Sequence, residues 1–234
     1  MTTGARAILF DLDDTLYPER QFVDGGFHAV AGFLAGFTGR SEADLADRLW
    51  ALHVRDGRGR LFDTLLAELG LDAADLSPAC LLVYRTHPAR LTAFPGAEAL
   101  LDRLRGTGIR TGVVSDGNAA VQSRKLAGLG TIAARLDVVV LTDDLGPGHA
   151  KPSPIPFGVA CRLLGVPPSA TIYVGNDPRK DFAGARSAGL RTIRIGALPD
   201  DGGAIAIAMS ASDDADLAVD SFDALSTTLS GMTT

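Results

Sequence analysis

Residues 171–195, TIYVGNDPRKDFAGARSAGLRTIRI, carry the pattern that decides the fold. The runs TIYV and TIRI near the two ends are apolar and rich in β-branched residues, which is typical of strands buried on both faces. Between them, RKDFAGARSAG has the apolar spacing of a short amphipathic helix. The stretch therefore predicts a strand, a helix and a second strand in succession.

The same alternation continues toward the N-terminus. Strand-like runs occur at AILF (7–10), TGVV (111–114) and LDVVVL (136–141), and each ends in a polar turn. Alternating strands and helices predict an α/β fold, a Rossmann-like doubly wound parallel sheet. Residues 215–229 are expected to add an edge strand and a helix, whereas AIAIAM (204–209) fits either a strand fragment or an ordered loop. Further helix-period segments are GAEALLDRLRGTG, AAVQSRKLAGLG and PIPFGVACRLLG.

One interval interrupts the alternation. No strand-like run occurs between AILF and about residue 111, and this interval shows apolar spacings near 3.6 separated by Gly, Pro and Ser. We expect four helices between residues 21 and 90, inserted into the α/β domain as a helical-bundle cap. The predicted domains are a core of residues 1–18 plus 92–234 and a cap of residues 19–91.

Composition excludes several classes of partner. The chain has 234 residues, 46% of them hydrophobic and 21% charged, which indicates an ordinary globular protein. A net charge of −6 argues against nucleic acid and anionic membranes as partners, so a small molecule is expected. Cys80 and Cys161 have no metal-ligand spacing and are predicted to be buried thiols. With no signal peptide or membrane-length apolar run, we expect a cytoplasmic monomer or homodimer.

Four polar clusters follow successive strand candidates. In an open α/β sheet the ligand crevice lies outside the carboxyl ends of the strands, so these clusters are expected to converge there. They are DLDDT (11–15), SDGN (115–118), Lys151 within HAKPSP, and GNDPRKD (175–181).

The carboxylates in these clusters predict a metal site. Asp11 and Asp13 repel each other unless a cation or a proton intervenes, and Asp177 and Asp181 add two more charges. An all-oxygen ligand set favours Mg²⁺ over zinc. The alternative is structural, because D-x-D-D-T also suits an Asx turn. Asp177 and Asp181 equally suit the N-terminal cap of the following helix.

The remaining two clusters suit an anion. Ser115 offers a hydroxyl, and Asp116, Gly117 and Asn118 form a helix N-terminus whose backbone N–H groups bind phosphate oxygens. Lys151, held between prolines, is a point cation for a phosphoryl group. A plain strand-to-helix turn and a solvated lysine are the alternatives for the two clusters.

FDLDDTLYP, VVSDGN, KPSP and VGNDPRKDFAGARSAG together resemble the four motifs of the haloacid dehalogenase superfamily of hydrolases, in order and across nearly the whole chain. The resemblance implies a Rossmann-like core with a helical cap between the first and second motifs. It implies that Asp11 is a nucleophile forming an aspartyl-phosphate and that Asp13 is the general acid and base. Ser115 and Lys151 would bind the phosphoryl group.

The resemblance also implies the identity of the metal ion and its ligands. Mg²⁺ would be held by Asp11, the Asp13 carbonyl and the acidic residues of the fourth motif. That motif usually has Asp directly after Gly, whereas Asn176 stands here and Asp177 follows. We expect Asp177 and Asp181 to be ligands, with Asn176 as a neutral helper.

Because the dehalogenases of the superfamily lack an acid two residues after the nucleophile, Asp13 favours phosphoryl chemistry. The predicted substrate is a sugar phosphate, a nucleoside monophosphate or a phosphoglycolate-like metabolite. Tyr17 and Arg58 are among the candidates for contacting it. The alternatives are a phosphomutase of the same superfamily and a non-catalytic protein that binds a phosphorylated ligand.

Overall fold

The structure, a computed structural model, describes residues 4–57, 59–196 and 215–232. Its internal contacts divide the chain into two compact units. One, the core unit, comprises Met1–Glu19 and Leu91–Thr234, and the other, the helical unit, comprises Arg20–Arg90. Each unit is described by itself below.

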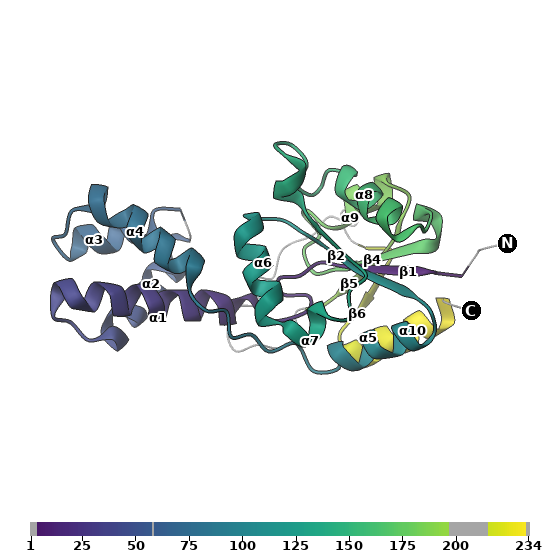
Figure 1. Cartoon of the computed structure of the whole chain (residues 1–234), viewed down its shortest axis with the longest axis horizontal. Helices are drawn as coiled ribbons and strands as arrows, with labels where there is room; N and C mark the ends of the chain where they lie inside the picture. Colours follow the sequence, from purple (N-terminus) through teal and green to yellow (C-terminus); the bar gives the residue numbers. More distant parts are fainter. Residues whose placement is uncertain (1–3, 58, 197–214, 233–234) are drawn as a thin grey trace. The chain divides into compact units, whose positions relative to one another are not determined.

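The core unit is built on a six-stranded parallel sheet with the order β3-β2-β1-β4-β5-β6 (Figure 1). The central strand β1 pairs with β2 on one side and β4 on the other, so that Phe10 lies opposite both Val113 and Val174. The carboxyl ends of these three strands therefore lie side by side. The strands are β1 (Ala7–Phe10), β2 (Arg110–Ser115), β3 (Val138–Leu141), β4 (Thr171–Gly175), β5 (Arg191–Ile195) and β6 (Leu217–Val219).

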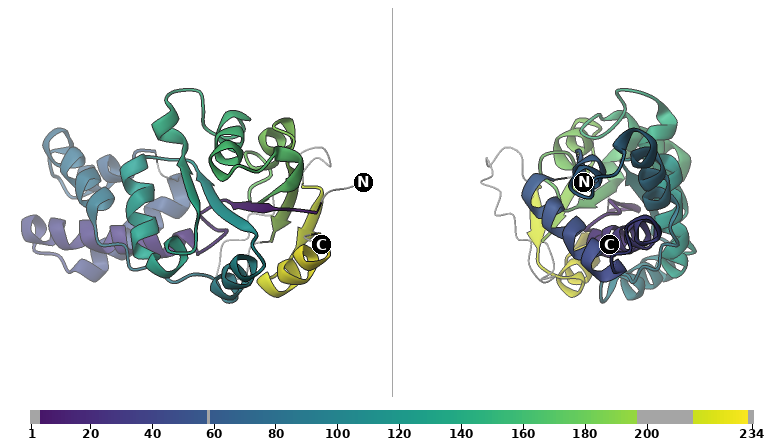
Figure 2. Two further views of the ribbon diagram at one scale, coloured as in Figure 1. Left: turned by 45° about the vertical axis from the view of Figure 1, so that its right-hand side comes forward. Right: turned by 90° about the vertical axis from the view of Figure 1, so that its left-hand side faces the viewer.

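Helices cover both faces of this sheet (Figures 1 and 2). On one face, α8 (Ile155–Leu164) packs on β1, β2 and β3, and α9 (Phe182–Ser187) packs on β4 and β5. On the other, α5 (Ala97–Gly106) packs on β2 and contacts α7 (Gly130–Ala133) and α10 (Phe222–Met232). The predicted doubly wound α/β fold is thus confirmed. The remaining elements of this unit are α6 (Ala119–Gly128) and the 3₁₀ helices η1 (Thr142–Leu145) and η2 (Pro168–Ala170).

Each strand and helix predicted for the core unit is present, including the late edge strand β6 and helix α10. The short elements α7, η1 and η2 were not predicted, because three or four residues are too few to show a period. The AIAIAM segment lies outside the described residues. Apolar side chains fill the layer between the sheet and α8, and Cys161 is a buried thiol there, as predicted.

The helical unit contains the four helices expected between residues 21 and 90. Ser41 and Asp72 cap the starts of two of them, since each side chain accepts a hydrogen bond from a backbone N–H in the first turn. The apolar faces meet in a second core, where Cys80 is the other buried thiol. That this unit acts as a cap stays a prediction. Its helices are α1 (Glu19–Thr38), α2 (Glu42–Asp56), α3 (Leu61–Glu68) and α4 (Ala73–Thr86).

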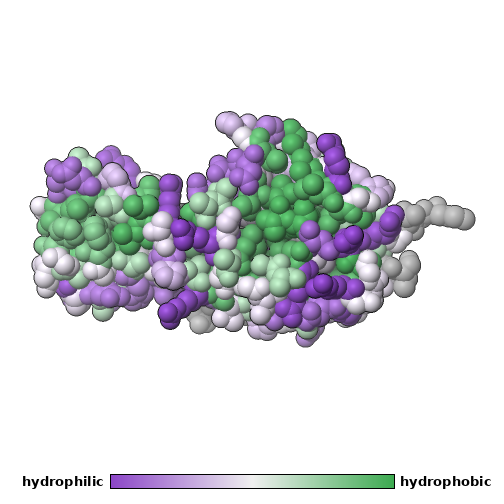
Figure 3. Space-filling view, viewed as in Figure 1, coloured by the Kyte–Doolittle hydropathy of each residue, from purple (hydrophilic) through white to green (hydrophobic). Residues whose placement is uncertain are grey.

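Among the described residues, no helix combines the length and the apolar character needed to cross a bilayer. Figure 3 shows an apolar area on the face of the core unit that this view presents, and Val139, Ile155 and Leu163 are exposed large apolar side chains of this unit.

Candidate active site

The nucleophile predicted from the sequence lies where β1 ends. The Asp11 N–H donates to the Val174 carbonyl at 2.8 Å, which extends the pairing of β1 with β4 by one residue. Leu12 is fully buried, and the chain then turns through Asp14, whose φ of 53° lies in the left-handed region. The Asp14 carboxylate accepts the Glu19 N–H at 2.8 Å, so it is structural.

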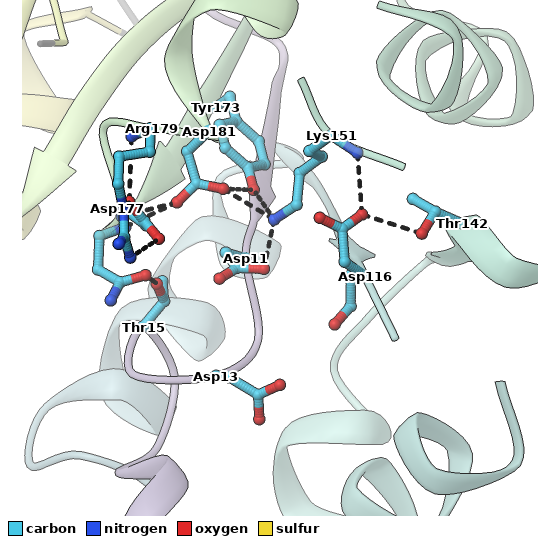
Figure 4. A network of polar contacts seen from close by, with 12 residues as sticks. Asp11, Asp13, Thr15, Asp116, Thr142, Lys151, Tyr173, Asp177, Arg179 and Asp181 are labelled. Atoms are coloured by element: carbon cyan, nitrogen blue, oxygen red, sulfur yellow. Dashed lines mark hydrogen bonds and ion pairs between the residues drawn. The ribbon is translucent and has the colours of Figure 1, made fainter. Parts of the chain in front are cut away.

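Lys151 joins two of the predicted carboxylates (Figure 4). Its Nζ lies 2.6 Å from Asp11 Oδ1 and 2.8 Å from Asp181 Oδ1. A third contact, 2.9 Å long, joins it to the Tyr173 hydroxyl. The side chains of Lys151 and Asp181 are fully buried and that of Asp11 is 2% exposed, so one cation contacts two carboxyl groups away from water. We call these four residues the nucleophile cluster.

Burial and charge act in opposite directions within the nucleophile cluster. Burial raises the pKa of Asp11 to about 6, although the neighbouring Lys151 charge opposes the rise. Burial alone would lower the pKa of Lys151, but the charges of Asp11 and Asp181 outweigh it and hold that pKa above its ordinary value. Lys151 is therefore a permanent cation.

Asp181 also orders the turn that follows β4. Its Oδ2 accepts the backbone N–H groups of Asn176 at 3.1 Å and Asp177 at 2.9 Å. A Cβ on Gly175 would lie 2.5 Å from this oxygen, so only glycine leaves room for the carboxylate. Asp181 thus contacts the Lys151 ammonium through one oxygen and accepts backbone N–H groups of the fourth motif through the other.

Asp13 stands apart from the nucleophile cluster in Figure 4 and has its own donors. The Tyr17 hydroxyl donates to its Oδ1 at 2.5 Å, and Gln122 Nε2 donates to its Oδ2 at 3.0 Å. Lys125 Nζ lies 2.8 Å from both oxygens. Gln122 Nε2 also donates to Ser115 Oγ at 2.6 Å, so one amide joins two predicted catalytic residues.

These donors reverse the effect of burial on Asp13. Burial by itself raises the pKa of this carboxyl, but the Lys125 charge and the hydrogen bonds from Lys125, Tyr17 and Gln122 hold it below its ordinary value. The Tyr17 pKa is raised, first by burial and then by the Asp13 charge, so Tyr17 stays a donor. The surroundings therefore shift the pKa values of the two D-x-D carboxyls in opposite directions, up for Asp11 and down for Asp13.

The SDGN cluster serves the backbone in several ways. Asp116 Oδ1 accepts the Thr142 hydroxyl at 2.9 Å and the Lys151 N–H at 3.0 Å, which ties three loops together. Asn118 caps α6 by accepting the Val121 N–H at 3.3 Å. Gly117 has a φ of +108°, which a side chain would strain. The N–H of Ala119, at the start of α6, donates to Asp143 at 3.0 Å, so protein acceptors already hold some of the expected phosphate-binding donors.

In the fourth motif, the side chains of Asn176 and Asp177 both have protein partners. The Asp177 carboxylate pairs with Arg179, at 2.9 Å from Nε and 2.7 Å from Nη2. Asn176 Oδ1 instead accepts the Thr15 hydroxyl at 3.3 Å, so it faces the loop that carries Asp11 and Asp13. Burial raises the Asp177 pKa, but the Arg179 hydrogen bonds and charge hold it below its ordinary value.

Two observations bear on a metal. Asp11 Oδ2 is buried and accepts no hydrogen bond from the part of the chain that the structure describes, which leaves an anionic oxygen suited to a hard cation. Within residues 4–57, 59–196 and 215–232, no three His, Cys, Asp or Glu side chains gather as a ready metal site. Asp177 is already paired with Arg179, and Asp181 with Lys151. The oxygens available to a metal ion thus fit a site with one carboxylate, that of Asp11, and neutral oxygens such as the Asp13 carbonyl and the Asn176 amide.

Sequence reasoning missed four residues that contact the predicted ones, and Arg58 lies outside the described residues. Tyr173 lies in a buried strand and gave no signal. Gln122 and Lys125 share the spacing of Leu126 and Leu129, and all four are buried. Two polar residues in the apolar stripe of α6 were the available signal. The fourth is Thr142, in the turn after β3.

Comparisons with known proteins agree with this geometry. A family model for haloacid dehalogenase-like hydrolases matches residues 5–189. The chain is 36% identical to a glyceraldehyde 3-phosphate phosphatase of Methanopyrus kandleri, over 81% of this chain and 83% of that protein. It is 30% identical to a phosphoserine phosphatase of Thermus thermophilus, over 84% of this chain and 91% of that protein.

Solved structures show the same architecture. A phosphatase of this superfamily from Thermococcus onnurineus superposes with a TM-score of 0.63 at 26% identity, covering 98% of this chain and 100% of its own. A 2-haloacid dehalogenase from Pseudomonas syringae gives 0.63 and 26%, with 97% and 99% covered. The chain therefore belongs to the haloacid dehalogenase-like hydrolases, and it is a phosphoric monoester hydrolase of that family.

Proposed function

We propose that this protein hydrolyses a small phosphorylated metabolite with Mg²⁺ and an aspartyl-phosphate intermediate on Asp11. One observation carries the proposal: Lys151 contacts Asp11 Oδ1, while Oδ2 has no hydrogen bond among the described residues. Oδ2 is thus available to a metal cation, and Oδ1, beside Lys151, is left to attack phosphorus.

The charge state of Asp11 suits a nucleophile. A carboxyl with a pKa of about 6 is about nine-tenths ionised at pH 7. Its raised pKa also makes it a stronger base than an exposed aspartate, which favours bond formation. Lys151 and the Ser115 hydroxyl are the groups that would hold the transferring phosphoryl oxygens.

Asp13 suits the second half of the cycle as it stands. Its lowered pKa leaves it ionised at neutral pH, so it can take a proton from the water that hydrolyses the phosphorylated Asp11. In the first half it must donate a proton to the leaving oxygen. A bound phosphoryl dianion would raise the pKa of this neighbouring carboxyl and load it with that proton.

Mg²⁺ would be held by Asp11 Oδ2, the Asp13 carbonyl and the turn that contains Asn176 and Asp177. When bound, it would neutralise charge on the phosphoryl group and so lower the repulsion between that group and Asp11. The unengaged Asp11 oxygen and the amide of Asn176 facing the same loop support this placement.

The substrate class follows from the relatives. They include phosphatases named for glyceraldehyde 3-phosphate, phosphoserine and, in Rhodospirillum rubrum, phosphoglycolate, which are small acyclic phosphate monoesters. Another, in Pseudomonas aeruginosa, is named for N-acetylmuramic acid 6-phosphate. We therefore place the acyclic esters first in the substrate panel, followed by sugar phosphates and then nucleoside monophosphates.

The test is phosphate release from this panel with Mg²⁺ or EDTA, for wild type and Asp11→Asn. The variant keeps the size of the side chain and removes the attacking charge. We expect Mg²⁺-dependent turnover by wild type and a loss of at least a thousandfold in the variant. Arg124→Met, which removes an exposed cation on α6, is the control and should retain full activity. Full activity of Asp11→Asn would refute the mechanism.

A further inference from the structure

Two polar residues of α6 are buried beside the site and have no part in the reaction as described so far. Gln122 is 2% exposed and Lys125 is 4% exposed, although neither residue type is commonly buried. They are three residues apart and so project from the same side of the helix. Burying them costs free energy that their hydrogen bonds must offset. The groups to which they donate therefore indicate their role.

Those partners are Asp13 and Ser115. Gln122 Nε2 donates to Asp13 Oδ2 at 3.0 Å and to Ser115 Oγ at 2.6 Å. An ionised carboxylate only accepts hydrogen bonds, so the amide must turn its NH₂ group toward Asp13. Ser115 Oγ then also accepts from this NH₂, which leaves the hydroxyl hydrogen to point at a phosphoryl oxygen. Gln122 thereby sets the direction in which Ser115 donates.

Lys125 completes the arrangement from the next turn of α6. Its ammonium lies 2.8 Å from both oxygens of Asp13 and 3.4 Å from Glu19. Contact with both oxygens fixes the plane of the carboxylate as well as its position. The Tyr17 hydroxyl fixes Oδ1 from the other end of the loop.

We propose that Gln122 and Lys125 are positioning residues that hold the Asp13 carboxylate and the Ser115 hydroxyl in a fixed relation to each other. The inference rests on the proposed function, in which Asp13 transfers the proton and Ser115 binds the phosphoryl group. Because the Gln122 amide donates to both side chains, a phosphate bound to Ser115 would have its leaving oxygen close to the Asp13 carboxylate.

The test compares two substrates in each variant. An alkyl phosphate such as glycerol 3-phosphate needs a proton on its leaving oxygen, whereas 4-nitrophenyl phosphate leaves as a stable anion and needs it far less. For Gln122→Met we expect kcat/KM to fall about tenfold more on the alkyl ester than on the aryl ester. Lys125→Met should shift the same ratio by about a hundredfold, the loss that a misplaced acid produces.

Arg124→Met is the matched control, since it removes a cation from the exposed position between the two and should leave the ratio unchanged. Equal losses on both esters would mean that the residues only support folding. A ratio that moves toward the alkyl ester would mean that Lys125 restrains proton donation instead of aligning it. Either result overturns the proposal.

A crystal structure of Lys125→Met decides the matter without turnover. The proposal expects the Asp13 carboxylate to leave its place beside Gln122, and an unmoved carboxylate would overturn it. If wild type hydrolyses no ester, the proposed function fails, and this structural readout still tests the positioning role.

Discussion

Replacement of Lys151 by methionine should destabilise the core unit strongly. Lys151 has 0% side-chain exposure and is the shared partner of Asp11 and Asp181, at 2.6 and 2.8 Å. Methionine keeps the length of the stem and removes the charge, which leaves two buried carboxylates facing each other. Breaking a buried ion pair by removing one partner costs about 3–5 kcal/mol of unfolding free energy. We expect about 4 kcal/mol here.

Asp11→Asn provides the opposite perturbation in the same cluster. It turns one cation with two anions into a balanced pair of Lys151 and Asp181, so its unfolding free energy should stay within about 1 kcal/mol of wild type. Both variants should lose turnover, but only Lys151→Met should lose stability. This contrast separates the charge balance of the cluster from its role in the reaction.

The effect of pH has a definite sign. The folded pKa of Asp11 is about 6, above the ordinary 3.8, so its contribution to stability is full below 3.8 and is lost between 3.8 and about 6. Without Lys151 the larger of the two opposing charges is gone and only that of Lys180 remains, so the folded pKa of Asp11 rises further and the loss extends above pH 6. The gap between wild type and Lys151→Met should therefore be larger at pH 8 than at pH 5.

Urea denaturation followed by far-UV circular dichroism at these two pH values, with EDTA present, measures the effect. Arg124→Met controls for the loss of a positive charge from the protein. The reasoning fails if Asp11→Asn is destabilised as much as Lys151→Met, or if the loss in Lys151→Met does not grow with pH.

Three further outcomes are expected. A Cβ on Gly184 would lie 2.1 Å from the Pro152 carbonyl, so Gly184→Ala should lower stability and activity together, whereas Gly158→Ala, with open space, should stabilise α8 by about 0.4–1 kcal/mol in thermal melts. Mg²⁺ at about 100 times its Kd should stabilise wild type by about 2.7 kcal/mol but leave the melting temperature of Asp11→Asn nearly unchanged. Asp116→Asn should lower kcat about tenfold in steady-state assays, because an amide is a weaker acceptor for the two loops that this carboxylate joins.

The sheet could be predicted because each strand is an apolar run that ends in a polar turn. Those ends are also where parallel strands place functional side chains, so Asp11, Ser115 and the Asp181 turn were found together with the fold. Lys151 lies farther along the loop after β3, and its position between two prolines marked it as a candidate cation. In this class of fold, the apolar runs that predict the strands also predict where the functional side chains lie, at the carboxyl ends of those strands.

The missed residues share a different physical cause. Gln122 and Lys125 lie in the apolar stripe of α6 with Leu126 and Leu129, which indicates burial but does not identify Asp13 and Ser115 as their partners. The orientation of Asp177 likewise depends on a local ion pair with Arg179, two residues away. Side-chain partners that come from distant segments or from the exact course of a turn leave no periodic trace in a sequence.

The D-x-D pair shows why the surroundings decide the chemistry. Asp11 and Asp13 are two residues apart and chemically identical, yet burial raises the pKa of one while Lys125 and its neighbours lower the pKa of the other. Carboxyls pushed apart in this way can take different roles in one reaction. In the proposed mechanism, Asp11 no longer titrates as a carboxyl once it carries a phosphoryl group, and Asp13 remains as the ionised base. The resting electrostatics would thus suit the hydrolytic step, and the charge of an arriving phosphate would prepare Asp13 for the first step.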